Sequence, residues 1–197
     1  MYENIRLQTS RLLLRPVSPD DLSTVYAYSS DGEHVKYMKY YPDESMEVCK
    51  RFLIQTCQEW SKEFPRCYVF AVIQNSRHIG EVSVYAEDEA FTIGELGWII
   101  HRDYCNKGYA SEAAQALLSF CQNTLHLNKV TACCDSRNSA SMKIMETLGM
   151  TVTEKDIPRK YLKRNETAFE IKAEKILHLD LSSLKRKYHY IKACISS

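Results

Sequence analysis

GELGWIIHRDYCNKGYASEAAQALLSF, residues Gly94–Phe120, contains an apolar strand, a short polar loop and an amphipathic helix in direct succession. A Gly-Tyr-Ala turn stands between the loop and the helix. This order places free backbone N–H groups and the positive end of a helix dipole beside the end of a strand. The segment therefore predicts a site for a phosphate-bearing ligand that is held mostly by main chain.

The whole chain has the composition of an ordinary globular protein. Its 197 residues are 45% hydrophobic and 26% charged, and its formal net charge is +1. Such a length fits one domain with a full core, and so small a charge gives no general attraction to nucleic acid or membranes. Met1–Arg15 lacks the apolar region of a signal peptide, and no run reaches the roughly 20 apolar residues of a membrane span. We expect a soluble, cytoplasmic protein.

The eight cysteines form no disulfide framework and no metal-ligand pattern. The chain has no C-x-x-C pair and no second cluster of Cys or His at ligand spacing. Cys133 and Cys134 are neighbours on an expected strand, so their side chains point to opposite faces. We expect reduced, mostly buried thiols and no bound metal.

The expected elements follow one another in the order of a mixed α/β sandwich. About seven strands are expected, at Arg11–Pro16, Cys67–Gln74, His78–Tyr85, Thr92–His101, Lys129–Asp135, Met150–Glu154 and Ala168–Leu177. About four helices are expected, the first capped by Ser18 with Pro19 at its first position, the others within Asp43–Lys62, Ala110–Leu125 and Asn138–Leu148. No repeat or Gly/Ser-rich linker divides the chain. The fold class is therefore a single-domain α/β fold with a mostly antiparallel sheet and one β-α-β crossover.

The loop before the central helix is the first candidate site. Gly108 can adopt backbone angles closed to other residues, and the small Ala110 permits close approach to the helix end. The amides from Asn106 to Ser111 would converge on an anion, and Lys107 adds a positive charge. A glycine before a helix is also typical of a simple turn, so the loop alone leaves both interpretations open.

The strand before the loop adds a carboxylate. Alternation places Glu95, Gly97 and Ile99 on one face, and Leu96, Trp98 and Ile100 on the other, which we expect to be core. Gly97 has no side chain and leaves room for a small reactive group beside Glu95. The alternative for Glu95 is a rim residue in a salt bridge.

The segment after the strand Lys129–Asp135 is the third candidate. Asn138 is a good helix N-cap, and Ser141 follows one turn later. A cap with a solvated serine and a functional pair are equally compatible with the local sequence.

These three parts, in this order, resemble the GNAT superfamily of acetyl-CoA-dependent N-acetyltransferases, and within it the group of ribosomal-protein alanine N-acetyltransferases. The motifs that carry the resemblance are TSRLLLRPVSPDDL, GELGWIIHRDYCNKGYASEA, NSASMKIMETLGM and RKYLKRNETAFEIKAEKI. The resemblance covers Ile5–Leu177. It implies an acetyltransferase domain over residues 1–178, with a central sheet splayed in the middle. Residues 179–197 extend past the resemblance as a basic tail.

Three positions depart from the superfamily pattern. Cys105 stands where the loop usually begins with Gln or Arg, and Met150 replaces the usual Phe. Met145 stands where many members carry a Tyr that is proposed to protonate the departing thiolate. In the subgroup that this chain resembles, the position of Ser141 is proposed for that task.

The resemblance implies acetyl-CoA as cosubstrate, bound between the strands Thr92–His101 and Lys129–Asp135. The implied binding residues are Trp98, Ile99 and Ile100 on the strand, Cys105, Asn106, Lys107, Gly108, Tyr109, Ala110 and Ser111 at the loop and helix start, and Asn138 with Ser141 beyond the next strand. Glu95 would act as base toward a primary amine, through a water, and a backbone N–H near Ile99 would hold the oxyanion. Tyr161 and Glu166 are the alternatives as acid or base.

The acceptor amine is not identified by these motifs. A peptide N-terminus and a small amine both fit, and the pocket is expected to include His34–Asp43 and Pro158–Asn165, with Tyr37, Tyr40, Tyr41 and Tyr161 as candidate lining. A non-catalytic CoA-binding sensor is the alternative function. The basic run Lys185–Tyr190 makes RNA binding a third, which we do not favour over a solvated tail. Either a monomer or a homodimer is compatible with the sequence.

Overall fold

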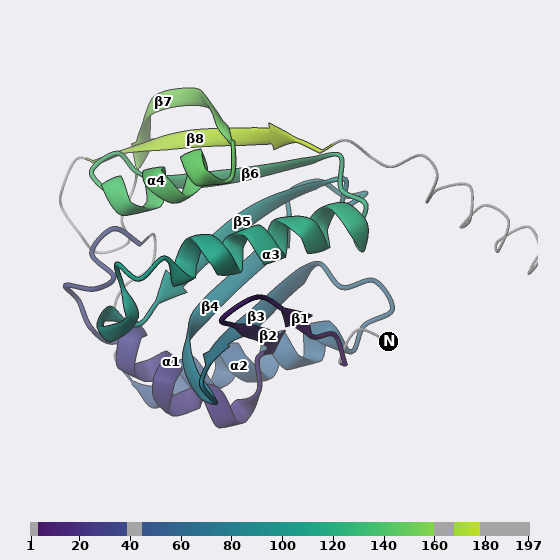
Figure 1. The fold of residues 1–197 in the computed structure, drawn as a ribbon, viewed down its shortest axis with the longest axis vertical. Coiled ribbons are helices and arrows are strands. Elements are labelled where there is room, and N and C mark those ends of the chain that lie inside the picture. Colours follow the sequence, from purple (N-terminus) through teal and green to yellow (C-terminus); the bar gives the residue numbers. More distant parts are fainter. Residues whose placement is uncertain (1–3, 39–44, 160–167, 178–197) are drawn as a thin grey trace, which may run out of the picture.

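The computed structural model describes residues 4–38, 45–159 and 168–177, and within them the chain forms an eight-stranded sheet with helices packed on it (Figure 1). The strand order is β1-β2-β3-β4-β5-β6-β8-β7. The strands are β1 (Leu7–Gln8), β2 (Leu13–Pro16), β3 (Cys67–Gln74), β4 (Arg77–Ala86), β5 (Ile93–Ile100), β6 (Lys129–Asp135), β7 (Thr151–Arg159) and β8 (Ala168–Ile176). The helices are α1 (Leu22–Ser29), α2 (Met46–Trp60), α3 (Tyr109–Asn123) and α4 (Ser139–Thr147), with 3-10 turns η1 (Pro19–Asp21) and η2 (Arg102–Tyr104).

Every neighbouring pair of strands is antiparallel except β5 and β6. That parallel pair is joined through α3, as a β-α-β crossover requires. The expected α/β class with a mixed, mostly antiparallel sheet is confirmed. None of the helices among the described residues is long and apolar enough to span a membrane.

The expected first strand, Arg11–Pro16, is wrong in its extent, because the chain forms a hairpin there. β2 begins at Leu13 and pairs with β1, with Leu7 opposite Leu14. Between the two strands, the Thr9 hydroxyl accepts a hydrogen bond from the Leu12 N–H at 2.9 Å. This side-chain bond to the backbone closes the turn and adds the eighth strand. β7 likewise extends beyond the expected Met150–Glu154.

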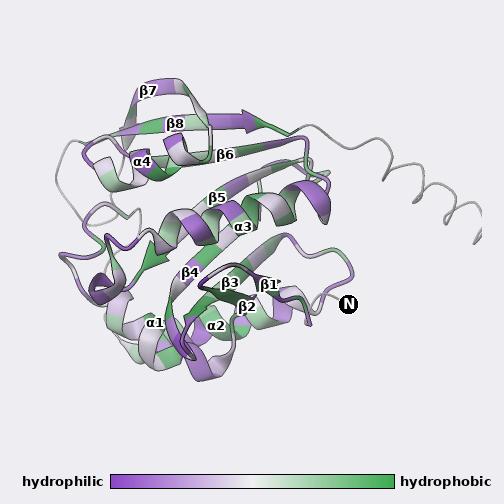
Figure 2. Cartoon of the chain, in the orientation of Figure 1, coloured by the Kyte–Doolittle hydropathy of each residue, from purple (hydrophilic) through white to green (hydrophobic). Residues whose placement is uncertain are grey.

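Side chains of β3 alternate between two hydrophobic cores. Tyr68, Phe70 and Val72 belong to the core that contains α3, whereas Val69 and Ala71 belong to the core that contains α1 and α2. Figure 2 shows the corresponding apolar residues along the central strands, and both polar and apolar residues along α3. A strand covered on both faces is apolar at nearly every position, which explains the run CYVFAVIQ.

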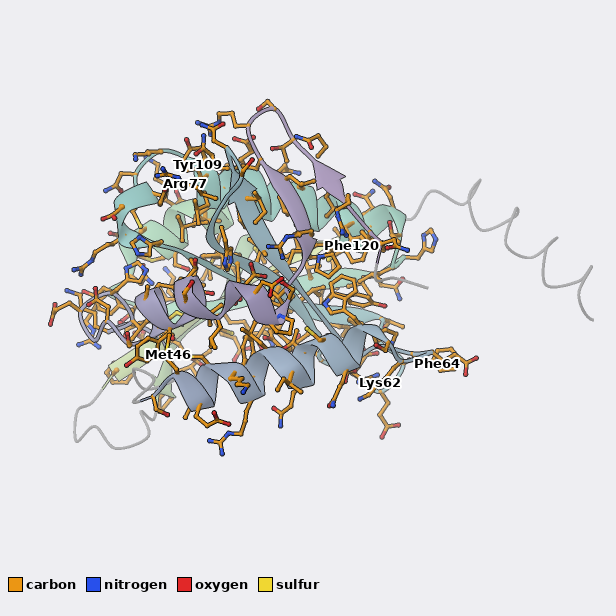
Figure 3. All side chains as sticks on the ribbon, turned by 90° about the horizontal axis from the view of Figure 1, so that it is seen from below. Met46, Lys62, Phe64, Arg77, Tyr109 and Phe120 are labelled. Carbon is orange, nitrogen blue, oxygen red and sulfur yellow. The ribbon has the colours of Figure 1, made fainter. Side chains whose placement is uncertain are left out.

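An aromatic cluster ties helices from both sides of the sheet to β3. The Phe70 ring centroid lies 5.1 Å from that of Trp60 on α2 and 5.2 Å from that of Phe120 on α3, both in edge-to-face geometry. Such pairs add to the stabilisation from area burial. Phe64, by contrast, extends from the body of the protein beyond the end of α2 (Figure 3).

The chain enters α1 through a buried ion pair. Both oxygens of Asp21 accept hydrogen bonds from Arg15, at 2.7 and 2.6 Å, and one also accepts the Ser18 N–H at 2.8 Å. Burial raises the pKa of Asp21, but these hydrogen bonds outweigh it and hold the pKa below its usual value. The expected arrangement of Ser18 as N-cap and Pro19 as first residue is confirmed, for the short turn η1.

The sheet opens between β5 and β6. Their pairing covers only Ile93–Glu95 against Lys129–Thr131. β5 stays paired with β4 as far as Ile100, and β6 stays paired with β8 as far as Asp135. Each strand therefore keeps its outer neighbour while the inner pairing ends, which confirms the expected splay.

Gly80 holds β4 close to β5 beside this opening. Its φ is +154°, and a Cβ built there would lie 2.2 Å from the Ile99 carbonyl oxygen. Because that contact is with backbone, we predict that Gly80→Ala lowers the free energy of unfolding by about 3 kcal/mol. Urea unfolding followed by tryptophan fluorescence measures the loss.

Gly97→Ala is the matched control for Gly80→Ala. A Cβ on Gly97 would meet only the Ser83 hydroxyl oxygen, at 2.7 Å, and that side chain can rotate. We expect a loss of about 1 kcal/mol or less. Equal losses in the two variants would contradict the assignment of Gly80 as the tight backbone contact.

Candidate functional site

Two residues of β5 direct backbone groups into the opening of the sheet. The Glu87 N–H donates to the Ile93 carbonyl at 2.9 Å, and the His101 N–H donates to the Ile79 carbonyl at 2.8 Å. In an antiparallel ladder these bonds recur at every second residue, so the odd-numbered residues of β5 pair with β4. Trp98 and Ile100 therefore turn their N–H groups away from β4, beyond the last pair with β6.

This register refines the expected backbone site. Ile99 lies opposite Glu81 and directs its N–H to β4, so it offers no donor to the opening. The Ile100 carbonyl accepts the Cys105 thiol at 3.4 Å. The groups that remain available toward the opening are the Trp98 N–H and carbonyl and the Ile100 N–H.

The loop between η2 and α3 leaves a row of amides without a partner. Asn106 and Gly108 have φ values of +60° and +77°, and Gly108 is the N-cap of α3. Among the described residues, the six N–H groups of residues 106–111 donate no hydrogen bond. Successive free amides at a helix N-terminus form an anion site.

Two side chains of the loop face the protein. The Cys105 thiol points to the end of β5, where burial raises its pKa, and its N–H donates to the Arg102 carbonyl. The Lys107 ammonium donates to the Asp103 carbonyl at 2.8 Å and lies 5.2 Å from the Tyr104 ring centroid. The loop therefore presents backbone, and the lysine charge is held at its side.

Arg11 contributes a positive charge that sequence reasoning missed. Its Nη1 donates to the Lys107 carbonyl at 3.0 Å, and its guanidinium lies 4.7 Å from the Tyr109 ring centroid. A Cβ built on Gly108 would lie 3.4 Å from Arg11 Nη2. The guanidinium thus lies beside the free amides, where it would also attract a bound anion.

Glu112 holds Arg11 in this place. Its carboxylate accepts hydrogen bonds from the Thr9 hydroxyl at 2.6 Å and from the Arg11 N–H and Nε at 3.0 and 2.6 Å. Burial acts to raise the pKa of Glu112, but these bonds outweigh it and keep the pKa below its usual value. The result is a fixed junction between the β1–β2 hairpin and the first turn of α3.

Glu95 occupies the point where the sheet divides. It is the last residue of β5 that pairs with β6, opposite Thr131, and its side chain is half-buried. The salt bridge considered as an alternative is not found among the described residues. The Ser83 hydroxyl lies next to Gly97, so it occupies the space that the sequence predicts beside Glu95.

A second carboxyl, that of Glu81 on β4, lies next to β5 and was not singled out from the sequence. It is opposite Ile99, only 8% exposed, and burial raises its pKa to about 8. Burial, and not its raised pKa, separates Glu81 from the opening. Glu95 remains the accessible carboxylate.

Asn138 and Ser141 connect β6 to the opening. The Asn138 side-chain oxygen accepts the Ser141 N–H at 3.1 Å, so Asn138 caps α4 as expected. The Ser141 hydroxyl accepts a hydrogen bond from the Trp98 indole N–H at 3.0 Å. The expectation that Trp98 is wholly core is wrong: the ring is half-buried and its polar edge reaches Ser141.

The remaining candidates divide between the described and the undescribed parts of the chain. Arg137 pairs with Asp135 at 2.8 Å and lies 5.6 Å from the Tyr37 ring centroid, so the segment after α1 reaches the end of β6. His101 caps η2, accepting the Asp103 N–H, and its ring lies edge-to-face with that of Tyr104. The described ranges contain no cluster of three metal-ligating side chains.

Outside the described residues lie Tyr40, Tyr41, Tyr161, Glu166 and the basic tail.

Comparison with known proteins finds matches over most of the chain. The family described as Acetyltransferase (GNAT) domain matches residues 11–151. An uncharacterized N-acetyltransferase of Bacillus subtilis, YnaD, is 33% identical over 150 residues, which cover 74% of this chain and 82% of that protein.

Solved structures resemble the fold at lower identity. RimL, a ribosomal L7/L12 alpha-N-protein acetyltransferase in complex with coenzyme A, superposes with a TM-score of 0.79 at 13% identity, covering 89% of this chain and all of that one. The ribosomal-protein-S5-alanine acetyltransferase of Vibrio fischeri gives 0.72 at 21% identity, covering 88% and 97%. At these identities the likeness concerns the fold.

The Glu112 junction generates a pH-dependent prediction. A lowered folded-state pKa means that the carboxylate stabilises the fold above its unfolded pKa, and that this is lost as the pH falls through the folded pKa. We predict that Glu112→Gln lowers the free energy of unfolding by about 1–2 kcal/mol at neutral pH, and by much less at about pH 3. Urea unfolding at the two pH values measures both.

Glu146→Gln is the control for Glu112→Gln. Glu146 is an exposed residue of α4, and its replacement is expected to change stability by less than about 0.5 kcal/mol at either pH. A Glu112→Gln effect that persists unchanged at low pH would mean that the side-chain shape, and not the carboxylate, holds the junction.

Proposed function

Because the chain belongs to the GNAT family of acetyltransferases, we propose that it transfers the acetyl group of acetyl-CoA to a primary amine by direct attack. The observation that carries this proposal is the opening of the sheet after Glu95 and Thr131, with unpaired Trp98 and Ile100 N–H groups that lead to the free amides of residues 106–111. The opening offers main-chain partners to an extended arm, and its far end offers an anion site.

The donor fits these groups by their chemistry. The pyrophosphate would meet the amides of residues 106–111, with the Arg11 guanidinium as an additional positive group. The pantetheine arm carries amides that can pair with the Trp98 carbonyl and the Ile100 N–H as an added strand would, which leaves the Trp98 N–H for the reacting end of the donor. Asn138 would act indirectly, by fixing the first turn of α4 next to this arm.

Glu95 is proposed as the base that prepares the amine. It stands at the division of the sheet, half-buried, with no ion-pair partner among the described residues. An α-amino group has a pKa near 7.7–8.0 and needs little help, whereas a lysine side chain near 10.4 needs an efficient base. Glu95 would accept the proton directly or through a water.

Main chain and Ser141 are proposed to stabilise charge during transfer. The Trp98 N–H is oriented toward the opening and would donate to the developing oxyanion. Ser141, 8% exposed at the start of α4, would donate a hydrogen bond from its hydroxyl to the CoA thiolate. Met145 is buried and has no group for this task, so the role falls to Ser141.

A protein or peptide N-terminus is the proposed acceptor class. Two of the structural neighbours act on ribosomal proteins by their descriptions. Glu95 as the accessible carboxylate of the opening in the described ranges also suits an α-amine, which is partly neutral at physiological pH. Tyr37 and Arg137, in contact beyond the end of β6, would form one wall of the acceptor site.

Thiol release from acetyl-CoA across peptides with different N-termini, polyamines, aminoglycosides and free amino acids tests the function. We expect turnover with at least one peptide, and no CoA binding by Gly108→Val, because valine at φ +77° distorts the loop. Gly149→Val, at φ +69° in the turn after α4, is the control that keeps CoA affinity. Tight CoA binding with no turnover on any amine would support a sensor instead.

The base assignment predicts a dependence on the acceptor. We expect Glu95→Gln to lower kcat/KM about 100-fold for a lysine side-chain acceptor and about tenfold or less for an α-amine, since the second needs less deprotonation. Steady-state kinetics on two peptides that differ only in which amine is blocked measures the difference. An equal loss on both peptides would show that Glu95 positions the acceptor and is not the base.

A further inference from the structure

One side-chain hydrogen bond crosses the opening of the sheet. Its donor, the Trp98 indole N–H, is on β5, and its acceptor, the Ser141 hydroxyl oxygen, is in the first turn of α4, which follows β6. The N–O distance is 3.0 Å. The bond therefore connects the two walls that the sheet pairing no longer joins.

The chemistry of the two groups fixes the direction of this bond. An indole N–H can only donate, so the Ser141 oxygen must accept and its own proton is directed elsewhere. Among the described residues, that hydroxyl proton has no acceptor, although Ser141 is only 8% exposed. A nearly buried hydroxyl that receives one hydrogen bond and gives none is prepared to donate to a ligand atom in the opening.

Donation from the indole also strengthens the hydroxyl as a donor. Hydrogen bonds in a chain polarise one another, most effectively where water is scarce. The Ser141 N–H is separately held by Asn138 at 3.1 Å, so the backbone that carries the hydroxyl is fixed as well. The serine is thus constrained at its main chain and at its oxygen.

We propose that Trp98 is a positioning residue whose indole N–H orients the Ser141 hydroxyl so that it donates a hydrogen bond to the departing CoA thiolate. The proposal rests on the proposed function. When the thioester C–S bond breaks, its electron pair goes to sulfur, and the Ser141 O–H donates a hydrogen bond to the resulting thiolate. Trp98 touches no reacting atom through its ring, and acts through the serine.

The test is a double-mutant cycle with Trp98→Phe and Ser141→Ala. Phenylalanine keeps an aromatic ring on β5 and removes the N–H. The first readout is the pKa of the thiol of bound CoA, from the ultraviolet thiolate absorbance of the CoA complex minus that of the desulfo-CoA complex. This measurement needs no acceptor amine. The second readout is kcat on the best acceptor.

We expect the pKa of the bound thiol to rise from wild type to Trp98→Phe to Ser141→Ala, with the double variant equal to Ser141→Ala. In kcat, we expect losses of about fivefold for Trp98→Phe and about 30-fold for Ser141→Ala, with KM for acetyl-CoA little changed. Adding Trp98→Phe to Ser141→Ala should then change neither readout.

Trp60→Phe is the matched control. Trp60 is the other tryptophan of the chain, buried in the aromatic cluster with an indole N–H that has no partner in the described structure. Its replacement alters packing without removing a hydrogen bond, and should leave the pKa of the bound thiol unchanged. In that variant Trp98 is the remaining indole, so its fluorescence reports CoA binding.

Three results would overturn the proposal. Equal effects of Trp98→Phe with and without the Ser141 hydroxyl would mean that the ring acts by packing. An unchanged pKa of the bound thiol in Trp98→Phe would mean that the indole does not act on the serine. Tighter CoA binding in both backgrounds would mean that the bond only closes the opening. Absence of CoA binding by the wild-type protein would instead overturn the proposed function.

Discussion

The pairing of β5 with β6 stops after Glu95 and Thr131, and the rest of the site depends on that short ladder. Buried backbone N–H groups need partners, and a sheet normally supplies them. Here the N–H groups of Trp98 and Ile100 point into the opening, because β4 forms hydrogen bonds with only every second residue of β5. A main-chain binding surface is thus produced inside the sheet without any special side chain.

The proposed anion site at the end of this surface depends on a second constraint, the junction around Glu112. Free amides at a helix start favour an anion, but only if the loop before them keeps its shape. Glu112 fixes Arg11, and Arg11 in turn binds the Lys107 carbonyl, so the loop is held from outside by the β1–β2 hairpin. Sheet opening and loop geometry are therefore set by different parts of the chain and meet at residues 100–106.

Local patterns predicted most of the architecture. The strands β3 and β4, the Gly108 turn before α3 and the Asn138 cap of α4 are determined by neighbours in sequence, and all three are found. The β1–β2 hairpin escaped notice because a threonine hydroxyl, and not a Gly or Pro signal, closes its turn. The extents of β2 and β7 were missed because pairing with a neighbouring strand, and not the local sequence, decides where each strand ends.

The candidate site was predictable in its main chain and less so in its side chains. Thr9 and Arg11 meet Glu112 about a hundred residues later in the chain, and no local pattern indicates such a contact. Trp98 has the spacing of a core residue, and only the placement of α4 reveals that its N–H has a partner. For Glu81, strand alternation predicts which face of the sheet the side chain lies on. It does not predict that α1 packs over that face and buries the carboxyl.

The opening also bears on how the protein avoids aggregation. Unpaired strand edges invite strands of other molecules, and proteins usually protect them with charges, bulges or covering loops. Here the exposed edge of β5 is interrupted after two N–H groups, because the Ile100 carbonyl is already taken by Cys105 and the chain turns into η2. A foreign β-strand could form too few hydrogen bonds there to offset the entropy of its ordering. The interior edge therefore offers hydrogen bonds to a short extended segment and not to a full β-strand.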